Sequence, residues 1–129
     1  MASIRNEVLL RAPAADVWDA IRDFGALHTR LVPGFVTDCK LEGDERIVTF
    51  ANGMVAREVL VDADGRLRRL AYAIVGGRAT YYGASVQVFD RGEGQSELVW
   101  VIDLLPNELA SGVAAMAAQG VAAMKKKFG

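Results

Sequence analysis

Glu58, Tyr72 and Tyr82 are the side chains of this sequence best suited to proton chemistry in an apolar environment. Alternation with period two places Glu58 on the same strand face as Ala56 and Leu60, which we assign to the protein interior. Burial raises the pKa of a carboxyl group, so Glu58 could act as a general acid or base near neutral pH. The two tyrosine hydroxyls could polarise a ligand carbonyl. A structural role is the alternative, with each polar group bonded to buried water or to another core residue.

The remaining reactive residue types do not form a recognisable catalytic or metal-binding pattern. His28 is the only histidine and Cys39 the only cysteine, and their positions give no metal-ligand spacing. His28 could shuttle protons near the mouth of a pocket, or it could simply be a surface residue. Gly76-Gly77-Arg78 is typical of a turn rather than a phosphate-binding loop. The sequence therefore predicts no metal and no cofactor.

Alternating apolar residues and hairpin turns indicate that most of the chain forms an antiparallel sheet. Asn52-Gly53 and Arg91-Gly92-Glu93-Gly94 are two of the turns, with residues that tolerate a positive φ. We expect strands at residues 4–11, 35–41, 46–51, 54–61, 66–75, 80–89 and 97–105.

Helical spacing appears near both ends of the chain. Pro13 suits the first turn of a short helix that Gly25 ends, and a second helical turn covers residues 26–31. Asn107 is a plausible N-cap for a long helix at residues 108–128. The order β-α-α-β6-α predicts a single α+β domain, residues 1–129, in which a curved antiparallel sheet of six to seven strands wraps around the C-terminal helix.

The C-terminal helix has few large side chains, which predicts an unfilled hollow beneath it. Its apolar stripe contains mainly small or flexible residues, and alanines flank the stripe. Close packing of helix on sheet is the alternative explanation for these small residues. With a hollow, the inward-facing residues form a mainly apolar ligand site with a few polar groups. The predicted ligand-binding residues are Phe50, Met54, Glu58, Leu60, Tyr72, Ile74, Tyr82, Ala84, Trp100, Leu109, Val113, Met116 and Gly120.

The charge balance and apolar content of the chain indicate which kinds of partner to expect. The 129 residues include 15 basic and 16 acidic side chains, so a nucleic-acid-binding surface is not expected. Apolar residues make up 52% of the chain but occur in short runs, which excludes a membrane span. The single cysteine and an N-terminus without signal-peptide features favour the cytoplasm. A homodimer or another protein partner is left open.

Several short motifs together resemble the START/SRPBCC helix-grip superfamily, which includes birch-pollen-type allergens and bacterial polyketide cyclases. They run from the start of the first helix to the last strand: Ala12-Pro13-Ala14-Ala15-Asp16-Val17-Trp18, Glu58-Val59-Leu60-Val61-Asp62, Leu70-Ala71-Tyr72-Ala73-Ile74-Val75-Gly76-Gly77, Tyr81-Tyr82-Gly83-Ala84, and Trp100 upstream of Leu105-Pro106. The resemblance implies that Glu58, Tyr72, Tyr82 and Ala84 line a pocket.

Two functions follow as hypotheses from these observations. The first is binding of a small hydrophobic molecule such as a lipid, an aromatic polyketide or an isoprenoid. The second is a cyclase or dehydratase of the polyketide type, in which Glu58 acts as general acid or base together with Tyr72 or Tyr82.

Overall fold

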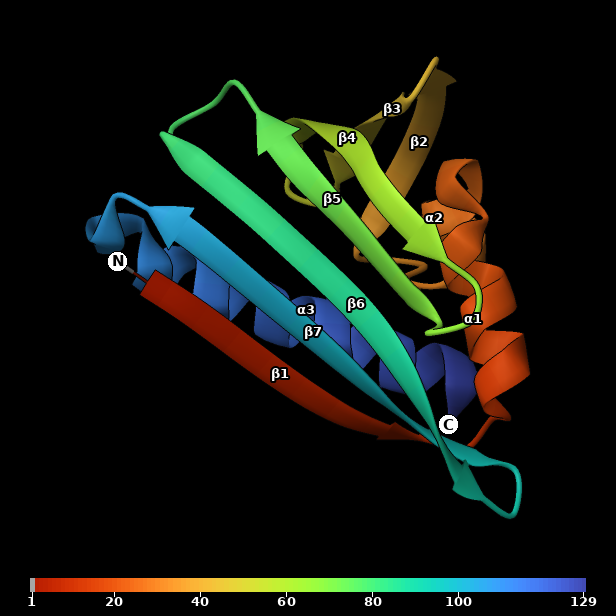
Figure 1. The fold of residues 1–129 in the computed structure, drawn as a ribbon. Coiled ribbons are helices and arrows are strands. Elements are labelled where there is room, and N and C mark those ends of the chain that lie inside the picture. Colours follow the sequence, from red (N-terminus) through yellow and green to blue (C-terminus); the bar gives the residue numbers. More distant parts are fainter. Residues whose placement is uncertain (1) are drawn as a thin grey trace.

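The computed structural model describes residues 2–129, which form a seven-stranded antiparallel sheet curved around a long C-terminal helix (Figure 1). The strand order is β1-β7-β6-β5-β4-β3-β2, so β1 and β2 are the two edges. The α+β helix-grip fold predicted from the sequence is confirmed. The elements are β1 (Ala2–Leu10), α1 (Ala14–Arg22), the 3-10 turn η1 (Phe24–Ala26), α2 (Leu27–Arg30), β2 (Val36–Glu42), β3 (Glu45–Phe50), β4 (Val55–Asp64), β5 (Arg69–Val75), β6 (Tyr81–Gly92), β7 (Gln95–Leu105), the 3-10 turn η2 (Asn107–Leu109) and α3 (Ala110–Phe128).

Several element boundaries differ from the expectation, among them the starts of β5 and of the last helix. β5 begins at Arg69 rather than at residue 66, because the Asp64 carboxylate accepts the backbone N–H groups of Arg66 and Leu67 at 2.9 and 3.1 Å and closes a turn. The predicted capping of the last helix by Asn107 is wrong. Asn107 lies inside η2, and α3 begins at Ala110 without a side-chain cap.

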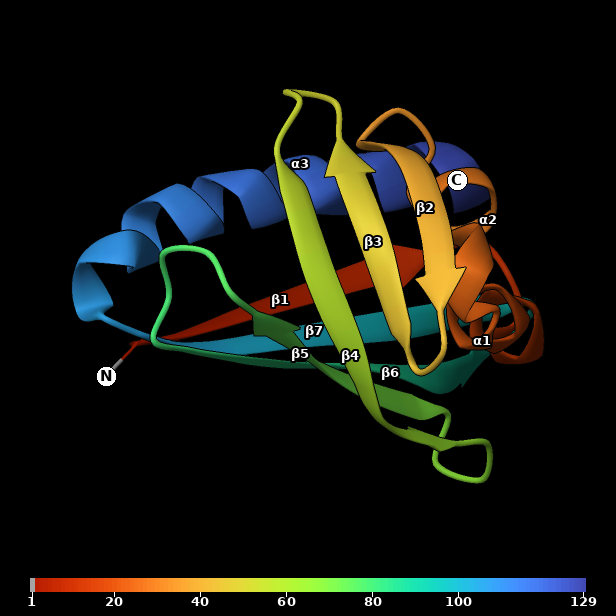
Figure 2. The same cartoon turned by 90° about the horizontal axis from the view of Figure 1, so that it is seen from above.

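The helix α3 lies across the concave face of the sheet, while α1 and α2 close one end (Figure 2). Apolar side chains from the sheet, from α1 and from α3 form one hydrophobic cluster. At Gly120 a Cβ atom would lie 3.0 Å from the Trp100 ring and 3.2 Å from the Phe35 ring. The small residues of α3 therefore allow the helix to approach the sheet closely, which is the packing alternative raised by the sequence.

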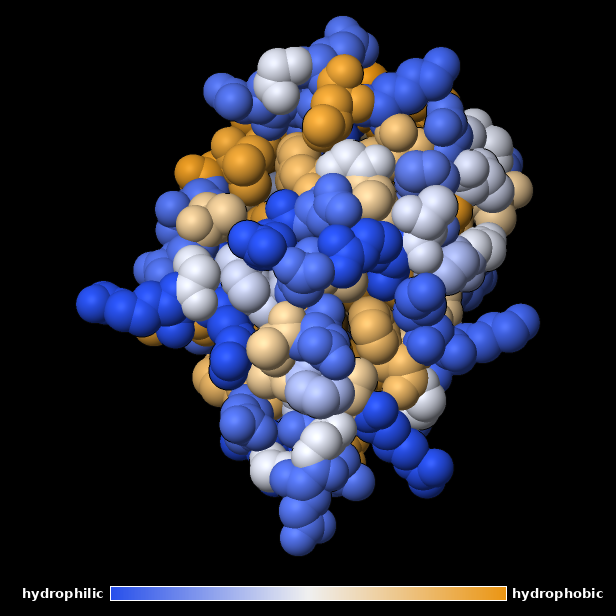
Figure 3. All heavy atoms as spheres, turned by 90° about the vertical axis from the view of Figure 1, so that its right-hand side faces the viewer, coloured by the Kyte–Doolittle hydropathy of each residue, from blue (hydrophilic) through white to orange (hydrophobic). Residues whose placement is uncertain are grey.

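Charged and apolar side chains intermingle on the surface at the end of the molecule that carries α1 and α2 (Figure 3). Within residues 2–129, no helix combines the length and the apolar character needed to cross a membrane.

Candidate functional site

A small, mainly apolar cavity of about 50 Å³ lies between the concave face of the sheet and α3. Seven of the residues that the sequence predicts for a ligand site lie in its wall: Phe50, Glu58, Tyr72, Ile74, Tyr82, Trp100 and Met116. Ten further residues complete the wall: Ile21, Leu27, Leu31, Val32, Phe35, Val36, Arg46, Leu70, Val86 and Met124.

The other six predicted ligand-binding residues lie outside the cavity wall. Met54 follows the β3–β4 turn and is 57% exposed. Gly120 packs directly on Trp100, and Ala84 is buried opposite Tyr72 in the sheet. The remaining three are partly buried at the margin of the core: Leu60, Leu109 and Val113.

The cavity is much smaller than the hollow expected from the helix sequence. The side chains that fill the space come from the sheet and from the segment after α2. Phe50 of β3 and Phe35 of that segment meet edge to face, with 5.3 Å between their ring centroids. Small residues on α3 reduce the distance between helix and sheet instead of leaving a void of ligand size. The remaining space suits a few water molecules, whereas sites for drug-sized ligands measure roughly 300–1,000 Å³.

A buried ion pair between Arg46 and Glu58 forms the polar part of the wall. The two residues are 5% and 4% exposed and lie directly opposite each other on β3 and β4. Arg46 Nε donates to Glu58 Oε1 at 2.9 Å, and Arg46 Nη2 lies 2.7 Å from the same oxygen. The second carboxylate oxygen, Oε2, receives no hydrogen bond from residues 2–129. One acceptor of the buried pair is therefore left for a ligand or water.

The guanidinium group of Arg46 is held on its other sides by aromatic and backbone groups. Its Nη1 donates to the carbonyl oxygen of Phe24 at 3.2 Å. Its central carbon lies 4.0 Å from the ring centroid of Phe24 and 5.5 Å from that of Tyr72, so both rings stabilise the cation. The ion pair thus connects β3 and β4 to the segment that leads into α2.

The sequence interpretation missed Arg46, although its position carries a readable pattern. Arg46 alternates with Val48 and Phe50, and all three are buried on the same face of β3. A charged residue in phase with an apolar face must be paired or hydrogen-bonded when it is buried. That pattern, together with Glu58 on the inward face of the next strand, predicts the pair.

Two tyrosine hydroxyls extend the polar region of the wall. The Tyr72 hydroxyl accepts a hydrogen bond from Trp100 Nε1 at 3.2 Å, which leaves its own proton free for donation. Desolvation raises the pKa of Tyr72 well above 10, and the Glu58 carboxylate adds to the effect. The pKa of Tyr82 is raised for the same two reasons. Both hydroxyls therefore remain protonated donors across the physiological pH range.

Burial also raises the pKa of Glu58 above its ordinary value, and the nearby Arg46 cation opposes this effect. A carboxyl group in this state exchanges a proton closer to neutrality than an exposed glutamate does. The cluster accordingly combines one group able to accept a proton with a cation and two hydroxyl donors.

The lone histidine and cysteine lie apart from the cavity wall. His28 is on α2, and its Nδ1 atom is buried without a partner among residues 2–129. Cys39 is buried on β2, where desolvation raises the pKa of its thiol. The described part of the chain contains no cluster of His, Cys, Asp and Glu able to hold a metal ion.

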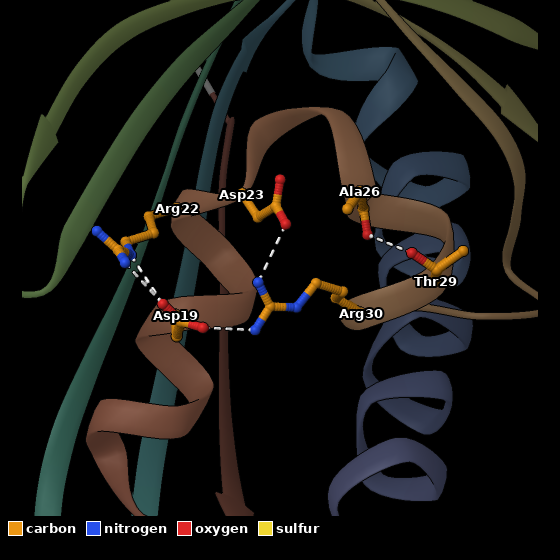
Figure 4. Close-up of polar contacts among 6 residues, drawn as sticks. All are labelled: Asp19, Arg22, Asp23, Ala26, Thr29 and Arg30. Carbon is orange, nitrogen blue, oxygen red and sulfur yellow. Dashed lines mark hydrogen bonds and ion pairs between the residues drawn. The ribbon is translucent and has the colours of Figure 1, made fainter.

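A second cluster of charged residues lies at the surface, between α1 and α2 (Figure 4). Arg30 bridges two carboxylates, with Nη2 lying 2.6 Å from Asp19 and Nη1 3.0 Å from Asp23. Arg22 reaches Asp19 from the opposite side at 2.8 Å. All four charges are satisfied within the cluster, so it serves to hold α2 against α1.

Comparison with known proteins gives a family match over the whole chain. The sequence profile described as "Polyketide cyclase / dehydrase and lipid transport" matches residues 1–129. Among curated proteins, none matches this chain significantly.

Solved structures share the fold. The Bacillus cereus protein XoxI has a TM-score of 0.88 and 21% identity, with 99% of this chain and 96% of that chain covered. A Thermobifida fusca protein solved by solution NMR has a TM-score of 0.77 and 30% identity, with 94% and 85% covered. A point mutant of Thalictrum flavum norcoclaurine synthase in complex with a transition-state analogue has a TM-score of 0.73 and 22% identity, with 97% and 92% covered.

Proposed function

The chain belongs to the polyketide cyclase/dehydrase and lipid transport family, and we propose that it binds one small, mainly apolar molecule in the cavity between the sheet and α3. The membership agrees with the helix-grip resemblance of the sequence. The observation that carries the proposal is a mainly apolar cavity whose wall contains one buried ion pair and two buried tyrosines.

The polar groups of the wall define which molecules fit. Tyr72 and Tyr82 offer hydroxyl donors, and Glu58 Oε2 offers an acceptor that Arg46 does not use. A pure hydrocarbon would leave these groups without partners, at a cost in free energy. We therefore expect an aromatic, polyketide or isoprenoid skeleton that carries a hydroxyl or carbonyl oxygen.

Binding requires the cavity to expand beyond its present volume of about 50 Å³. Met116 and Met124 are the flexible side chains of α3 in its wall, and unbranched methionines adapt readily to different shapes. Leu31 and Val32, which follow the four-residue helix α2, form a wall that does not belong to the sheet. Displacement of these side chains can enlarge the site without disturbing the strands.

Naphthalene and naphthol provide a direct test, because they differ only in one hydroxyl group. Both should raise the melting temperature of the full chain, and naphthol should do so at lower concentration. Tyr82→Phe should reduce the advantage of naphthol over naphthalene, while Tyr81→Phe, at an exposed position, should leave it unchanged. Equal effects of the two probes, or no shift of the Trp100 indole resonance on binding, would contradict the proposed site.

A second candidate function is proton transfer on a bound carbonyl compound, as in a cyclase or dehydratase. The observation that favours it is the raised pKa of Glu58 next to the hydroxyls of Tyr72 and Tyr82 and the cation of Arg46. Glu58 would accept the proton released when a C–H bond beside the carbonyl breaks. The electron pair of that C–H bond would form a C=C bond, and the π pair of the carbonyl would move onto its oxygen, where a tyrosine O–H stabilises the enolate.

Deuterium exchange into the aryl ketone indanone, followed by NMR, tests this second function. The wild-type chain should accelerate exchange beside the carbonyl, and Glu58→Gln should abolish the acceleration while binding persists. Glu93→Gln, on the exposed β6–β7 turn, is the matched control. Acceleration that survives Glu58→Gln would exclude Glu58 as the base and leave the binding proposal standing.

A further inference from the structure

The two edges of the sheet differ in how they are protected against pairing with another strand. β2 follows Pro33, contains a bulge between Val36 and Asp38, carries the exposed Lys40 and is packed against α2. Proline, bulges, lysines and covering elements are the usual means of blocking an edge. β1 contains no proline, lysine or bulge in its nine residues and no strand lies beyond it in the sheet, while α3 packs against it (Figure 1).

β1 is also regular enough to accept a further strand. It pairs with β7 without interruption from Ala2, opposite Leu104, to Leu10, opposite Ser96. In a strand that is hydrogen-bonded on one side only, the N–H and C=O groups of every second residue point away from the sheet. This edge therefore presents a continuous row of backbone donors and acceptors that β7 does not use.

The charges on the outer face of β1 are self-complementary. Arg5 and Glu7 flank Asn6, and their side chains are 60% and 51% exposed. In an antiparallel pair of two copies with Asn6 opposite Asn6, each Arg5 lies opposite the other copy's Glu7. On the inner face, Ile4 then lies opposite Val8. Such cross-strand pairs of opposite charge and of apolar residues are favourable.

The neighbouring registers are unfavourable. Centring the pair on Arg5 places two arginines opposite each other, and centring it on Glu7 places two glutamates opposite each other. A pair centred between two neighbouring residues would place an inner-face residue of one copy opposite an outer-face residue of the other. Only the register centred on Asn6 pairs opposite charges and keeps both faces continuous.

Asn6 lies at the centre of this register, with its side chain on the inner face of β1. Its side-chain Nδ2 is buried without a hydrogen-bond partner among residues 2–129. A buried amide nitrogen in this state is costly. This nitrogen is shielded by its own chain, so the register depends on the exposed charges of the outer face and not on the asparagine amide.

We propose that two copies of this chain associate through their β1 strands, antiparallel and centred on Asn6, to form one continuous sheet with a two-fold axis. Antiparallel pairing of identical edges generates a closed, isologous dimer. The cavities of the two copies remain separate, so this dimer is independent of the ligand proposed above.

Reversing the charges of Arg5 and Glu7, singly and together, tests the proposal. Arg5→Glu alone and Glu7→Arg alone should each weaken the dimer on the order of tenfold or more, because both symmetric pairs become repulsive. The double variant Arg5→Glu with Glu7→Arg restores opposite charges and should restore the dimer. Analytical ultracentrifugation of the full chain over a wide concentration range measures this, with Lys40→Glu on β2 as the matched control.

Hydrogen exchange distinguishes this interface from any other. The outward-pointing amides of β1 should become protected as the concentration of wild-type protein rises, while those of β2 should not change. A chain that stays monomeric at every concentration, or a dimer unaffected by the single charge reversals, would overturn the proposal.

Discussion

Two arginine–carboxylate clusters in this protein use the same chemical groups in opposite surroundings. Arg46 and Glu58 face each other inside the sheet and are almost fully buried. Arg30, Asp19 and Asp23 join α1 to α2 at the surface, where each side chain retains more than a third of its exposure (Figure 4). The distances are similar, since the closest contacts are 2.7 Å in the buried pair and 2.6 Å in the surface cluster.

The comparison shows that geometry alone does not decide what an ion pair contributes. In the cavity wall, the surrounding protein shields both side chains from bulk solvent, so each charge depends on its partner for solvation. At the surface, water and salt screen the charges and replace a lost partner at little cost. A residue pair kept in the interior despite its desolvation cost is therefore the better candidate for a functional role.

The largest effect should follow from removing one member of the buried pair. Arg46→Met leaves the Glu58 charge without a partner and should lower the free energy of unfolding by about 3–5 kcal/mol near neutral pH. Combining it with Glu58→Leu should recover most of this loss, because neither charge is then buried. Urea unfolding of the two single variants and the double variant measures the coupling. Additive losses would show that the two side chains act independently.

The pH dependence of stability should have opposite signs in the two clusters. The pKa of Glu58 is raised from 4.5 by burial, so the folded state binds the proton more tightly, and the stability contributed by Glu58 falls as the pH rises above 4.5. The pKa of Asp19 is lowered from 3.8 by hydrogen bonds from Arg30 and Arg22, so its contribution is lost as the pH falls below that value. Unfolding measured against pH for wild type, Glu58→Gln and Asp19→Asn should separate the two trends. Parallel pH profiles for both variants would contradict the assigned shifts.

Alkaline titration should report on the hydroxyls beside the buried pair. The pKa values of Tyr72 and Tyr82 are raised above 10, so these two of the three tyrosines should stay protonated above pH 10 while the chain is folded. Their contribution to stability is then lost as the pH rises further, because only the unfolded chain releases those protons readily. The ultraviolet absorbance of tyrosinate measures the ionised fraction. Ionisation of both in the folded chain would mean that water reaches the cavity wall.

The smallest effect is expected in the surface cluster. Arg30→Ala should lower the melting temperature only slightly, and added salt should remove most of the difference from wild type. Salt should leave the loss caused by Arg46→Met almost unchanged. Thermal unfolding at low and high ionic strength compares the two variants. A large, salt-independent loss for Arg30→Ala would mean that the position of α2 depends on this cluster.

The strands and their inward faces were predictable from alternation, because a sheet with one buried face repeats every two residues. Glu58, Tyr72, Tyr82 and Trp100 were placed around one interior volume in this way, and all four lie in the cavity wall. The same alternation on β3 places Arg46 on the buried face with Val48 and Phe50.

The size of the cavity could not be predicted in the same way. Six expected lining residues lie outside the wall, because Gly120 brings α3 onto Trp100 and because the segment containing Leu31 and Phe35 fills the space below the helix. How closely a helix approaches a sheet depends on the combined shapes of side chains far apart in the sequence.

The sequence by itself determined the order of elements, the inward faces of β4, β5, β6 and β7 and the family to which the chain belongs, since these depend on local periodicity and short motifs. Only the tertiary structure decided that Glu58 is paired with Arg46 through a single oxygen, and that the space beneath α3 holds about 50 Å³. The reason is physical: solvation of a buried charge and the volume left between packed elements are set by all the surrounding atoms together, and no single segment carries that information.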